Sequence, residues 1–456
     1  MQTSQIEKKK PFITRGLSGL HNLGNTCYMN AALQCLFATD VLVGYFLRKE
    51  FKDDLRSGVT TILAQNIRKN KKIKEGDQIK IKSAKVRYFF KESLTYNFYR
   101  IISIVWKLNC IVKPYAFKKI VGTKNQMFAG FHQNDSHEFL NFVLDMIHEE
   151  TKTPAQLEII DMPESVIEYM KIRDQYNTAI SKLPDDKKLQ VIEAYNKIRL
   201  NKLFEDAILK SCQTWKSYLE KNHSRIVDIF TGMFMSEVQC NECKNKTFTF
   251  DPYNMIQLEL TKLYGTCTIN ECFDNYTKNE LLTGQEKYQC TICNKKTEAN
   301  KKICLWHVPD RLIIHLKRFS NNHSYTNKNN TFVDFPIKNL DISKNISSYI
   351  TNINSIDKYD LYGIVNHSGS LTGGHYIAYT KNPISGEWFE FNDSDVIRIE
   401  EDEVKREIVT NGAYILFYKK QDKKTEDLDD SVSDDISINS SQLNDECEDI
   451  YKDCLI

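Results

Sequence analysis

The sequence has almost no net charge, because 62 lysine and arginine residues face 60 aspartate and glutamate residues, which leaves +2 at neutral pH. Because positive and negative charges nearly cancel, the chain offers no broad electrostatic attraction to nucleic acid or to an anionic membrane. No apolar run reaches the roughly 18 residues that a membrane-spanning helix needs, and the N-terminal MQTSQIEKKKPF lacks the apolar core of a signal peptide. We therefore expect no nucleic acid and no membrane as partners, and a cytoplasmic or nuclear location. The sequence indicates no oligomeric state.

A disulfide framework is likewise not expected, although the sequence contains 13 cysteines. Without a secretion signal, cysteines are expected to serve as reduced thiols, metal ligands or catalytic groups. Hydrophobic residues make up 41% of the sequence and charged residues 27%, which is typical of a globular protein with a sizeable core.

Helical patterns occupy the first half of the chain and strand patterns the second. Two segments with apolar residues at helical spacing, residues 25–49 and NDSHEFLNFVLDMIHEE, predict buried helices. Residues 162–222 show a polar helical pattern interrupted at Pro184, which predicts an inserted group of two or three helices. After Ile229, short runs rich in β-branched and aromatic residues, such as RLIIHLKRF and HYIAYT, predict strands. Helices followed by strands favour an α+β architecture.

The two ends of the chain and one internal segment lack these patterns. Residues 1–15 are polar and are expected to be flexible. Residues 421–456 are acidic and serine-rich, with Tyr451 as their single aromatic residue, and are expected to form a disordered tail. The asparagine-rich stretch at 320–330 is expected to be a loop between two strands. The folded part is therefore expected to span residues 16–420.

Two C-x-x-C pairs, Cys240 with Cys243 and Cys290 with Cys293, are separated by 46 residues. Each pair presents two thiolates at the spacing that tetrahedral zinc requires, and the two pairs complete a site of four thiolates. The long separation indicates a metal that holds two distant hairpins together. We expect one structural zinc ion, with four ordinary cysteines or a redox pair as the alternatives.

Three further residue types are consistent with a nucleophilic site. GLHNLGNTCYMNAALQCL places Cys27 at the first turn of a predicted helix, where the helix dipole favours a thiolate. His375 follows two glycines at the start of a strand in LTGGHYIAYT, and taken alone it is better explained as a core histidine. Asn392, 17 residues later, ends an aromatic strand and is followed by Asp393. Two strands of one hairpin can bring imidazole and amide side by side, as a Cys–His–Asn or Cys–His–Asp triad requires.

These motifs occur in a fixed order along the chain: GLHNLGNTCYMNAALQCL, FHQNDSHEFLNFVLDMI, the paired C-x-x-C motifs, LIIHLKRF, YGIVNHSGSLTGGHYIAYT and WFEFNDSDV. In this combination the sequence resembles the ubiquitin-specific protease family of deubiquitinating cysteine peptidases over roughly residues 16–420. The resemblance implies a papain-like right hand with a helical thumb, a β-rich palm and zinc-tipped β fingers. The expected limits are about 16–228 for the thumb, including the insertion 162–222, 229–300 for the fingers and 301–420 for the palm.

The resemblance implies a thiol-dependent deubiquitinase that hydrolyses the bond after the C-terminal glycine of ubiquitin. In it, Cys27 is the nucleophile and His375 is the general base and then the general acid. Asn392 stands where many relatives have aspartate, so Asp393 remains a second candidate for orienting the histidine. Asn22, five residues before the cysteine, holds the oxyanion in this family. The alternative is that it is only a turn residue.

The resemblance also implies a channel for the tail of ubiquitin between thumb and palm. The tail carries arginine, so a carboxylate in the channel wall has a physical reason. For Asp135, capping of its own helix is an alternative or an additional role. Loops at 320–330 and 367–373 occupy the positions of family loops that flank this channel. The expected tail-binding residues are Gln133, Asp135, Gly373 and Gly374.

Ubiquitin and ubiquitinated proteins are thus the expected partners. Two other functions remain open at this point. One is a catalytically silent scaffold that binds ubiquitin, although all the expected catalytic residue types are present. The other is a protease for a ubiquitin-like modifier, because the contacts of the fingers cannot be read from the sequence.

Overall fold

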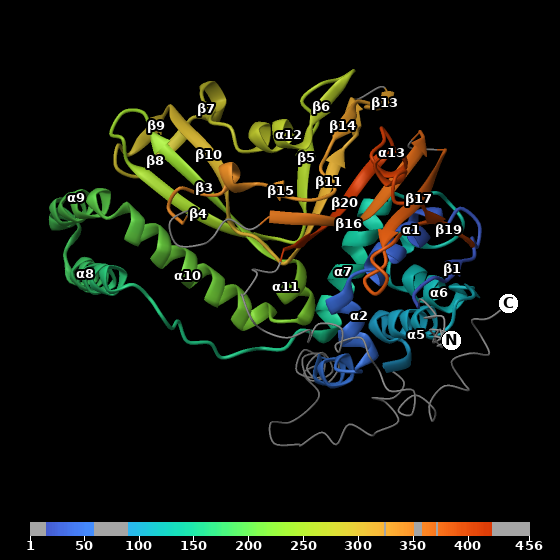
Figure 1. Ribbon diagram of the computed structural model, residues 1–456. Helices are drawn as coiled ribbons and strands as arrows, with labels where there is room; N and C mark the ends of the chain where they lie inside the picture. Colours follow the sequence, from blue (N-terminus) through green and yellow to red (C-terminus); the bar gives the residue numbers. More distant parts are fainter. Residues whose placement is uncertain (1–14, 59–89, 323–324, 351–357, 371–372, 422–456) are drawn as a thin grey trace, which may run out of the picture.

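The computed structural model describes residues 15–58, 90–322, 325–350, 358–370 and 373–421. The expectations for residues 1–15 and 421–456 fall outside the described residues, apart from one residue at each boundary. Most helices lie on one side of the molecule and the strands on the other, in the thumb, palm and fingers arrangement, with α12 and α13 among the strands (Figure 1). The predicted α+β right hand is therefore confirmed.

The thumb is a group of helices around α1 (Cys27–Phe37), in which every residue is buried. α7 (Ser136–Thr151) begins at an Asp135 cap, whose side chain accepts a hydrogen bond from His137 N at 2.7 Å. α1 packs against α7 on one side and against the palm strand β17 (Gly374–Lys381) on the other, so it lies between thumb and palm. The other thumb helices are α2 (Asp40–Leu47), α5 (Leu94–Lys107), α6 (Tyr115–Lys124) and α11 (Arg225–Phe230).

The palm is an eight-stranded sheet in the order β19-β18-β17-β16-β20-β11-β5, with β15 paired to β16. All neighbouring strands are antiparallel except β5 and β11. Because β17 and β18 are antiparallel neighbours, the start of β17 and the end of β18 lie at the same end of the sheet. The strands not yet delimited are β5 (Ile256–Glu259), β11 (Arg311–Lys317), β15 (Leu340–Asp341), β16 (Lys358–Gly369), β18 (Trp388–Asn392), β19 (Asp395–Ile399) and β20 (Ala413–Lys420).

The fingers contain a four-stranded antiparallel sheet in the order β4-β3-β10-β7 and a separate ribbon, β8 with β9. β10 continues in this sheet to His307, beyond the expected limit at residue 300. β5, within the expected finger range, joins the palm instead, because it pairs in parallel with β11. A finger strand therefore extends into the range expected for the palm, 301–420, and a palm strand lies within the range expected for the fingers, 229–300. The finger strands are β3 (Gly232–Cys240), β4 (Lys246–Tyr253), β7 (Glu280–Leu282), β8 (Tyr288–Cys290), β9 (Lys295–Thr297) and β10 (Ala299–His307).

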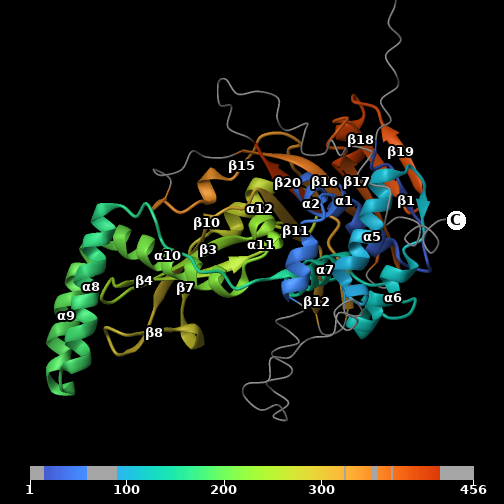
Figure 2. The same ribbon diagram turned by 90° about the horizontal axis from the view of Figure 1, so that it is seen from below.

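The helical segment expected at 162–222 consists of α8 (Glu164–Lys182), α9 (Asp185–Asn201) and α10 (Leu203–Asn222). The sequence placed these helices within the thumb range 16–228, and in the structure their main contacts are with one another and with the finger strands. Apolar side chains of α8 and α10 share a core with the finger strands; α10 runs along these strands, and α8 and α9 lie at the outer end of the fingers (Figures 1 and 2). The shared core includes Val166, Tyr169, Leu209, Met235, Phe250 and Trp306.

The expected loop at 320–330 contains a β-hairpin instead. β12 (Phe319–Asn322) pairs in antiparallel register with β13 (Tyr325–Lys328). The asparagine-rich sequence lacks the alternation of apolar and polar residues that identifies a strand, so only the backbone pairing reveals it. The remaining elements are β1 (Gly19–Leu20), β2 (Ile111–Val112), β6 (Thr266–Thr268), β14 (Phe332–Asp334), α12 (Ile269–Tyr276), α13 (Val404–Ile408) and the short 3-10 helices at 126–128, 284–286 and 343–345.

No single helix in the described ranges has both the length and the apolar composition of a membrane span. α1 and α2 satisfy these criteria only when they are joined, and they are bent by 85° at the break.

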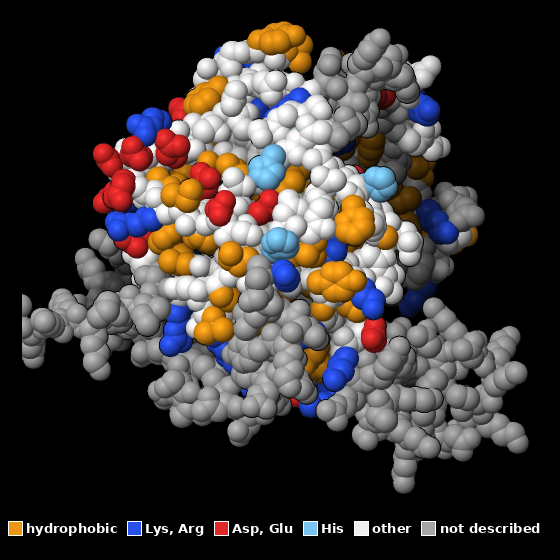
Figure 3. Space-filling model, turned by 90° about the vertical axis from the view of Figure 1, so that its right-hand side faces the viewer, with side chains coloured by type: hydrophobic (Ala, Val, Ile, Leu, Met, Phe, Trp, Pro, Cys, Tyr) orange, Lys and Arg blue, Asp and Glu red, His pale blue; other side chains and the backbone are white. Residues whose placement is uncertain are grey.

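On the face opposite the fingers, side chains of both charge signs are visible, with acidic ones gathered toward one edge (Figure 3).

Candidate active site

The loop before Cys27 depends on two residues with a left-handed backbone. Gly24 has a φ of 103° and Asn25 a φ of 54°, conformations that glycine adopts freely and asparagine tolerates. The chain then enters α1 through Thr26, the N-cap residue. Cys27 is therefore the first helical residue, and only 2% of it is exposed. Its thiol lies at the positive end of the helix dipole.

The Cys27 thiol has a raised pKa. Burial is the main cause of the increase, and the Asp393 carboxylate adds to it. Backbone N–H groups, first of all that of Tyr376, oppose the increase by hydrogen bonding to the sulfur. An ordinary thiol already has a pKa of about 8.5, so this thiol is protonated at neutral pH and needs a base to become a nucleophile.

His375 directly precedes Tyr376 on β17, and the backbone N–H of Tyr376 is bonded to the Cys27 sulfur. Its Nε2 lies 2.7 Å from Asn392 Oδ1. Because an amide oxygen only accepts hydrogen bonds, Nε2 carries the proton and Nδ1 keeps a lone pair. In the described part of the chain the ring makes no hydrogen bond to the Cys27 thiol, a contact that in many enzymes forms only when substrate binds.

Asp393 follows at the turn between β18 and β19, with a φ of 51°. Its carboxylate accepts hydrogen bonds from two amide side chains, Asn22 Nδ2 at 2.9 Å and Asn30 Nδ2 at 2.8 Å. The sequence left Asp393 as a candidate for orienting His375. In the structure the group bonded to the imidazole is Asn392, and the Asp393 carboxylate faces the loop before the nucleophile instead.

The Asn22 side chain is fixed at both of its polar atoms. Its Oδ1 accepts hydrogen bonds from Gly24 N at 2.9 Å and from Thr26 N at 3.1 Å. Its Nδ2 donates one hydrogen to Asp393 and keeps a second one for an incoming acceptor. The turn role and the oxyanion role are therefore compatible, because the same amide can serve both.

Gln133 connects the thumb to the palm. Its Nε2 donates to Gly374 O at 2.6 Å, and its Oε1 accepts from Gly374 N at 2.9 Å. Since Gly374 precedes His375, these two bonds fix the start of β17. A Cβ atom on Gly374 would lie 2.1 Å from His367 Nε2, so a side chain does not fit there. Gly373 has more room, because the nearest atom of the described residues, Ser370 Oγ, would lie 3.7 Å from a Cβ at that position.

Asp135 uses both carboxylate oxygens. Oδ1 caps α7 by accepting from His137 N at 2.7 Å, and Oδ2 accepts from the Tyr414 hydroxyl at 2.5 Å. The capping role that the sequence offered is therefore observed. A carboxylate has about four acceptor positions, which leaves room for a cationic partner as well.

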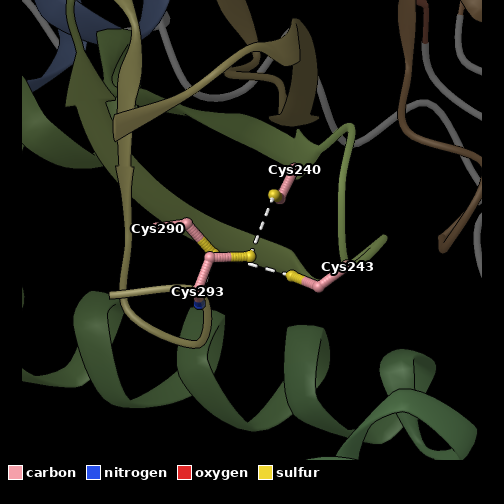
Figure 4. Close-up of side chains that lie close together, drawn as sticks. All are labelled: Cys240, Cys243, Cys290 and Cys293. Carbon is pink, nitrogen blue, oxygen red and sulfur yellow. Dashed lines mark hydrogen bonds between the residues drawn. The ribbon is translucent and has the colours of Figure 1, made fainter. Parts of the chain in front are cut away.

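Four cysteine side chains converge at the tip of the fingers (Figure 4). Their sulfur atoms all lie within 4.8 Å of one another, with 3.6 Å between Cys243 and Cys290 and 3.9 Å between Cys240 and Cys293. Four thiolates at about 2.3 Å from a tetrahedral zinc are about 3.8 Å apart. The four predicted ligands are thus brought together at the size of a single metal site.

Two residues of this region were not singled out from the sequence. Asn30 is a polar residue one turn after Cys27 in a wholly buried helix, and that contrast was an available signal. Tyr414 lies among other aromatic and apolar residues of AYILFYKK, so nothing in the sequence marks its hydroxyl as a partner of Asp135.

The fold is that of a papain-like cysteine peptidase with thumb, palm and fingers. A family model described as ubiquitin carboxyl-terminal hydrolase matches residues 18–418. The chain is 33% identical over 408 residues to Ubiquitin carboxyl-terminal hydrolase 2 of Bos taurus, covering 89% of this chain and 55% of that protein. It is 30% identical over 432 residues to Probable ubiquitin carboxyl-terminal hydrolase R319 of Acanthamoeba polyphaga mimivirus, covering 90% and 91% of the two chains. The chain belongs to the ubiquitin carboxyl-terminal hydrolase family.

Solved structures show the same fold. The SAGA Ubp8/Sgf11/Sus1/Sgf73 DUB module bound to ubiquitin aldehyde contains a chain with a TM-score of 0.59 and 23% identity, covering 90% of this chain and 70% of that one. The chain spans 55% of the length of the Bos taurus and Homo sapiens relatives, so it corresponds to about half of those proteins.

Proposed function

We propose that this chain is a thiol-dependent deubiquitinase, which hydrolyses the isopeptide or peptide bond after the C-terminal glycine of ubiquitin. The observation that carries the proposal is the hydrogen bond between His375 and Asn392, together with the backbone N–H of Tyr376, the residue after His375, which lowers the pKa of the Cys27 thiol. Membership of the ubiquitin carboxyl-terminal hydrolase family supports this activity. The similar fold of a chain bound to ubiquitin aldehyde supports ubiquitin as the partner.

In the first half-reaction, His375 Nδ1 accepts the thiol proton and the Cys27 sulfur attacks the carbonyl carbon of the terminal glycine. The carbonyl oxygen becomes an oxyanion, to which Asn22 Nδ2 donates its second hydrogen. The imidazolium then gives its proton to the departing amine, and the carbon–nitrogen bond breaks. The products are the released amine and a thioester between Cys27 and ubiquitin.

In the second half-reaction, His375 takes a proton from water, and the oxygen attacks the thioester carbon. The carbon–sulfur bond breaks, the sulfur recovers a proton from the imidazolium, and ubiquitin leaves with a free carboxyl group. Asn392 holds the Nε2–H tautomer throughout, so that Nδ1 faces the reaction. Its amide orients the ring without adding a charge.

Asp393 acts in this mechanism as a positioning residue for Asn22. Its Oδ2 receives one hydrogen of Asn22 Nδ2, which directs the other hydrogen of the same nitrogen. Its Oδ1 is held by Asn30, so the carboxylate itself has a fixed orientation. Asn392 and Asp393, adjacent in sequence, thus serve different partners.

Replacing Asp393 by alanine is expected to lower kcat by about 10²-fold with little change in KM. Without Asp393 the Asn22 amide is no longer held in one orientation, so it stabilises the oxyanion much less. Asn22→Ala is expected to have a loss of similar size. The Asp393→Ala, Asn22→Ala double variant should then be no slower than either single variant, since both changes remove one interaction. Losses that multiply in the double variant would show that Asp393 acts independently of Asn22.

Gln133, Asp135, Gly373 and Gly374 are proposed to receive the tail of ubiquitin. Gln133, which precedes the thumb helix α7, and Gly374, at the start of the palm strand β17, are bonded to each other in the structure, and we propose that the route to Cys27 passes between them. The tail must therefore cross this bridge or displace it. The free acceptor capacity of Asp135 suits an arginine of the tail.

One structural zinc ion is proposed at Cys240, Cys243, Cys290 and Cys293. The sulfur separations fit a tetrahedral site, and no carboxylate or histidine is needed to complete it. The ion would join β3 to the β8–β9 ribbon at the finger tip, far along the chain from Cys27. Its contribution is to hold the fingers, and no chemical step passes through it.

Metal analysis of the purified protein is expected to give one zinc ion per chain, with the four thiols protected from titration until a chelator removes the metal. The physical reason is that four thiolates at this spacing bind zinc strongly. Replacing Cys293 by serine should reduce the zinc content. A folded protein without stoichiometric zinc, and with all four thiols freely titratable, would refute the assignment.

Turnover of a ubiquitin C-terminal fluorogenic amide tests the proposed function. Steady release of the fluorophore at neutral pH is the expected result. Ubiquitin binding without release would instead identify a silent scaffold. Release from a ubiquitin-like modifier but not from ubiquitin would keep the chemistry and change the substrate.

A further inference from the structure

One charged side chain of the helical insertion is buried against the loop that carries the first cysteine pair. Arg199 lies on α9 and is only 6% exposed, although arginine is rarely buried without a dedicated partner. α9 has no other fully buried residue among those whose burial is described. This position therefore needs an explanation that the general packing of the helices does not supply.

The guanidinium donates to the last residue of that loop and to the first residue of β4. Its Nη1 lies 2.7 Å from Lys246 O, and its Nη2 bonds to Asn245 Oδ1. Asn245 is itself only 3% exposed, and its backbone oxygen accepts a hydrogen bond from Cys240 N at 2.9 Å. A single residue thus links the arginine to the backbone of Cys240.

The loop between Cys240 and β4 makes a tight reversal at this point. Lys244 has a φ of 60°, a left-handed conformation that costs a lysine free energy unless the surroundings hold it in place. Arg199 donates hydrogen bonds to the two residues that directly follow Lys244. It therefore acts where the loop that carries Cys243 turns back toward the sheet.

An acidic residue anchors the arginine from the other side. Asp206 on α10 is 1% exposed, and its Oδ2 lies 3.2 Å from Arg199 Nη1 and 3.0 Å from Lys210 Nζ. Its Oδ1 accepts from the Tyr169 hydroxyl of α8 at 3.0 Å, and Tyr169 lies 3.0 Å from the Tyr195 hydroxyl of α9. One polar network thus joins all three inserted helices and ends on the cysteine loop.

We infer that Arg199 is a positioning residue for the four-cysteine site, and that the inserted helices brace the metal-bearing tip of the fingers. The inference rests on the proposed zinc site. A buried ion pair contributes little net stability, because desolvation of both charges offsets their attraction. A rigid fork of donors, in contrast, fixes the direction of the groups that it contacts. Figure 4 shows helices of the insertion beside the cluster, as this arrangement requires.

Removing the Arg199 guanidinium should weaken metal binding and leave the catalytic step at Cys27 unchanged. Groups that hold metal ligands in place typically change metal affinity by about 10–100-fold when they are replaced. We therefore expect Arg199→Met to lower zinc affinity by about 10-fold. The KM for a ubiquitin substrate should rise as the fingers loosen, while kcat stays unchanged, because the catalytic groups lie in the thumb and palm.

The test is zinc affinity measured by competition with a chromophoric chelator, for the full-length protein and three variants. Arg199→Met removes the fork, and Asn245→Ala removes one of its acceptors while the ion pair with Asp206 remains. Arg173→Met is the matched control, because Arg173 also joins two inserted helices, by bonding to Gln213 Oε1 at 2.9 Å, and has no bond to the cysteine loop.

Lower zinc affinity in Arg199→Met and Asn245→Ala, with an unchanged value in Arg173→Met, is the expected result. Equal affinities in all four proteins would overturn the inference and leave the zinc site standing. If the unmodified protein holds no zinc, both the metal site and the inference fail. If Arg199→Met does not fold, Asn245→Ala decides between these outcomes.

Discussion

Replacing Cys27 by alanine is expected to abolish hydrolysis of ubiquitin substrates and to leave ubiquitin binding intact. Without the sulfur no thioester can form, so the rate should fall by 10⁴-fold or more, on the order of losses seen when a nucleophile is removed. The side chain is 2% exposed and offers almost no surface for binding. Fluorescence release and equilibrium binding of ubiquitin, measured on the same preparation, check the two parts separately.

Cys110→Ala is a matched control for this change. Cys110 is another thumb thiol, partly buried, whose sulfur lies 4.0 Å from the Ser18 hydroxyl. Its loss should leave turnover unchanged. Retained turnover in Cys27→Ala, or an equal loss in Cys110→Ala, would contradict the assignment of the nucleophile.

His375→Ala is expected to be nearly as damaging at neutral pH, because the thiol then lacks a base and the departing amine lacks an acid. The small remaining rate should rise with pH. The thiolate is the reactive form, and the raised pKa of the Cys27 thiol keeps it scarce at neutral pH. Below that pKa the thiolate fraction grows about tenfold per pH unit. The measurement is turnover of a ubiquitin fluorogenic amide between neutral and alkaline pH.

The control for His375 is His223→Ala. His223 precedes α11, and its Nε2 lies 3.3 Å from Asp228 Oδ1. It is not one of the residues that the mechanism uses. Its variant should retain both the wild-type rate and the wild-type pH profile. An undiminished rate in His375→Ala at neutral pH would remove the histidine from the mechanism.

The buried helices and the cysteine cluster were predictable from local sequence. Residues 25–49 have apolar residues at helical spacing, and the structure forms two helices in this range, α1 and α2. The two C-x-x-C pairs have a spacing with few structural explanations, and the structure brings all four sulfurs together. In these cases the information lies within a short segment.

The partners of Asp393 and of Arg199 were not predictable in the same way. Asp393 is adjacent to Asn392, and a φ of 51° at Asp393 turns its carboxylate toward Asn22 and Asn30. Arg199 lies in a helix of polar composition, where an arginine is expected to face solvent, yet it contacts a loop 46 residues away. Both depend on contacts between distant segments, which neither composition nor periodicity records.

The inserted helices show the same limit on a larger scale. Their existence and the break at Pro184 followed from the sequence. Their placement did not, because an apolar stripe indicates that a helix is buried and not what covers it. The stripe of α8 and α10 packs on the fingers, through residues such as Tyr169 and Leu209.

The most direct test of the proposed function is to trap the nucleophile with ubiquitin that carries an electrophilic group at its C-terminus, and to identify the modified residue by mass spectrometry. We predict one ubiquitin adduct per chain, on Cys27, which is absent when the probe carries a ubiquitin-like modifier in place of ubiquitin. A folded protein that forms no adduct, or that forms one on any other cysteine, would contradict the proposal.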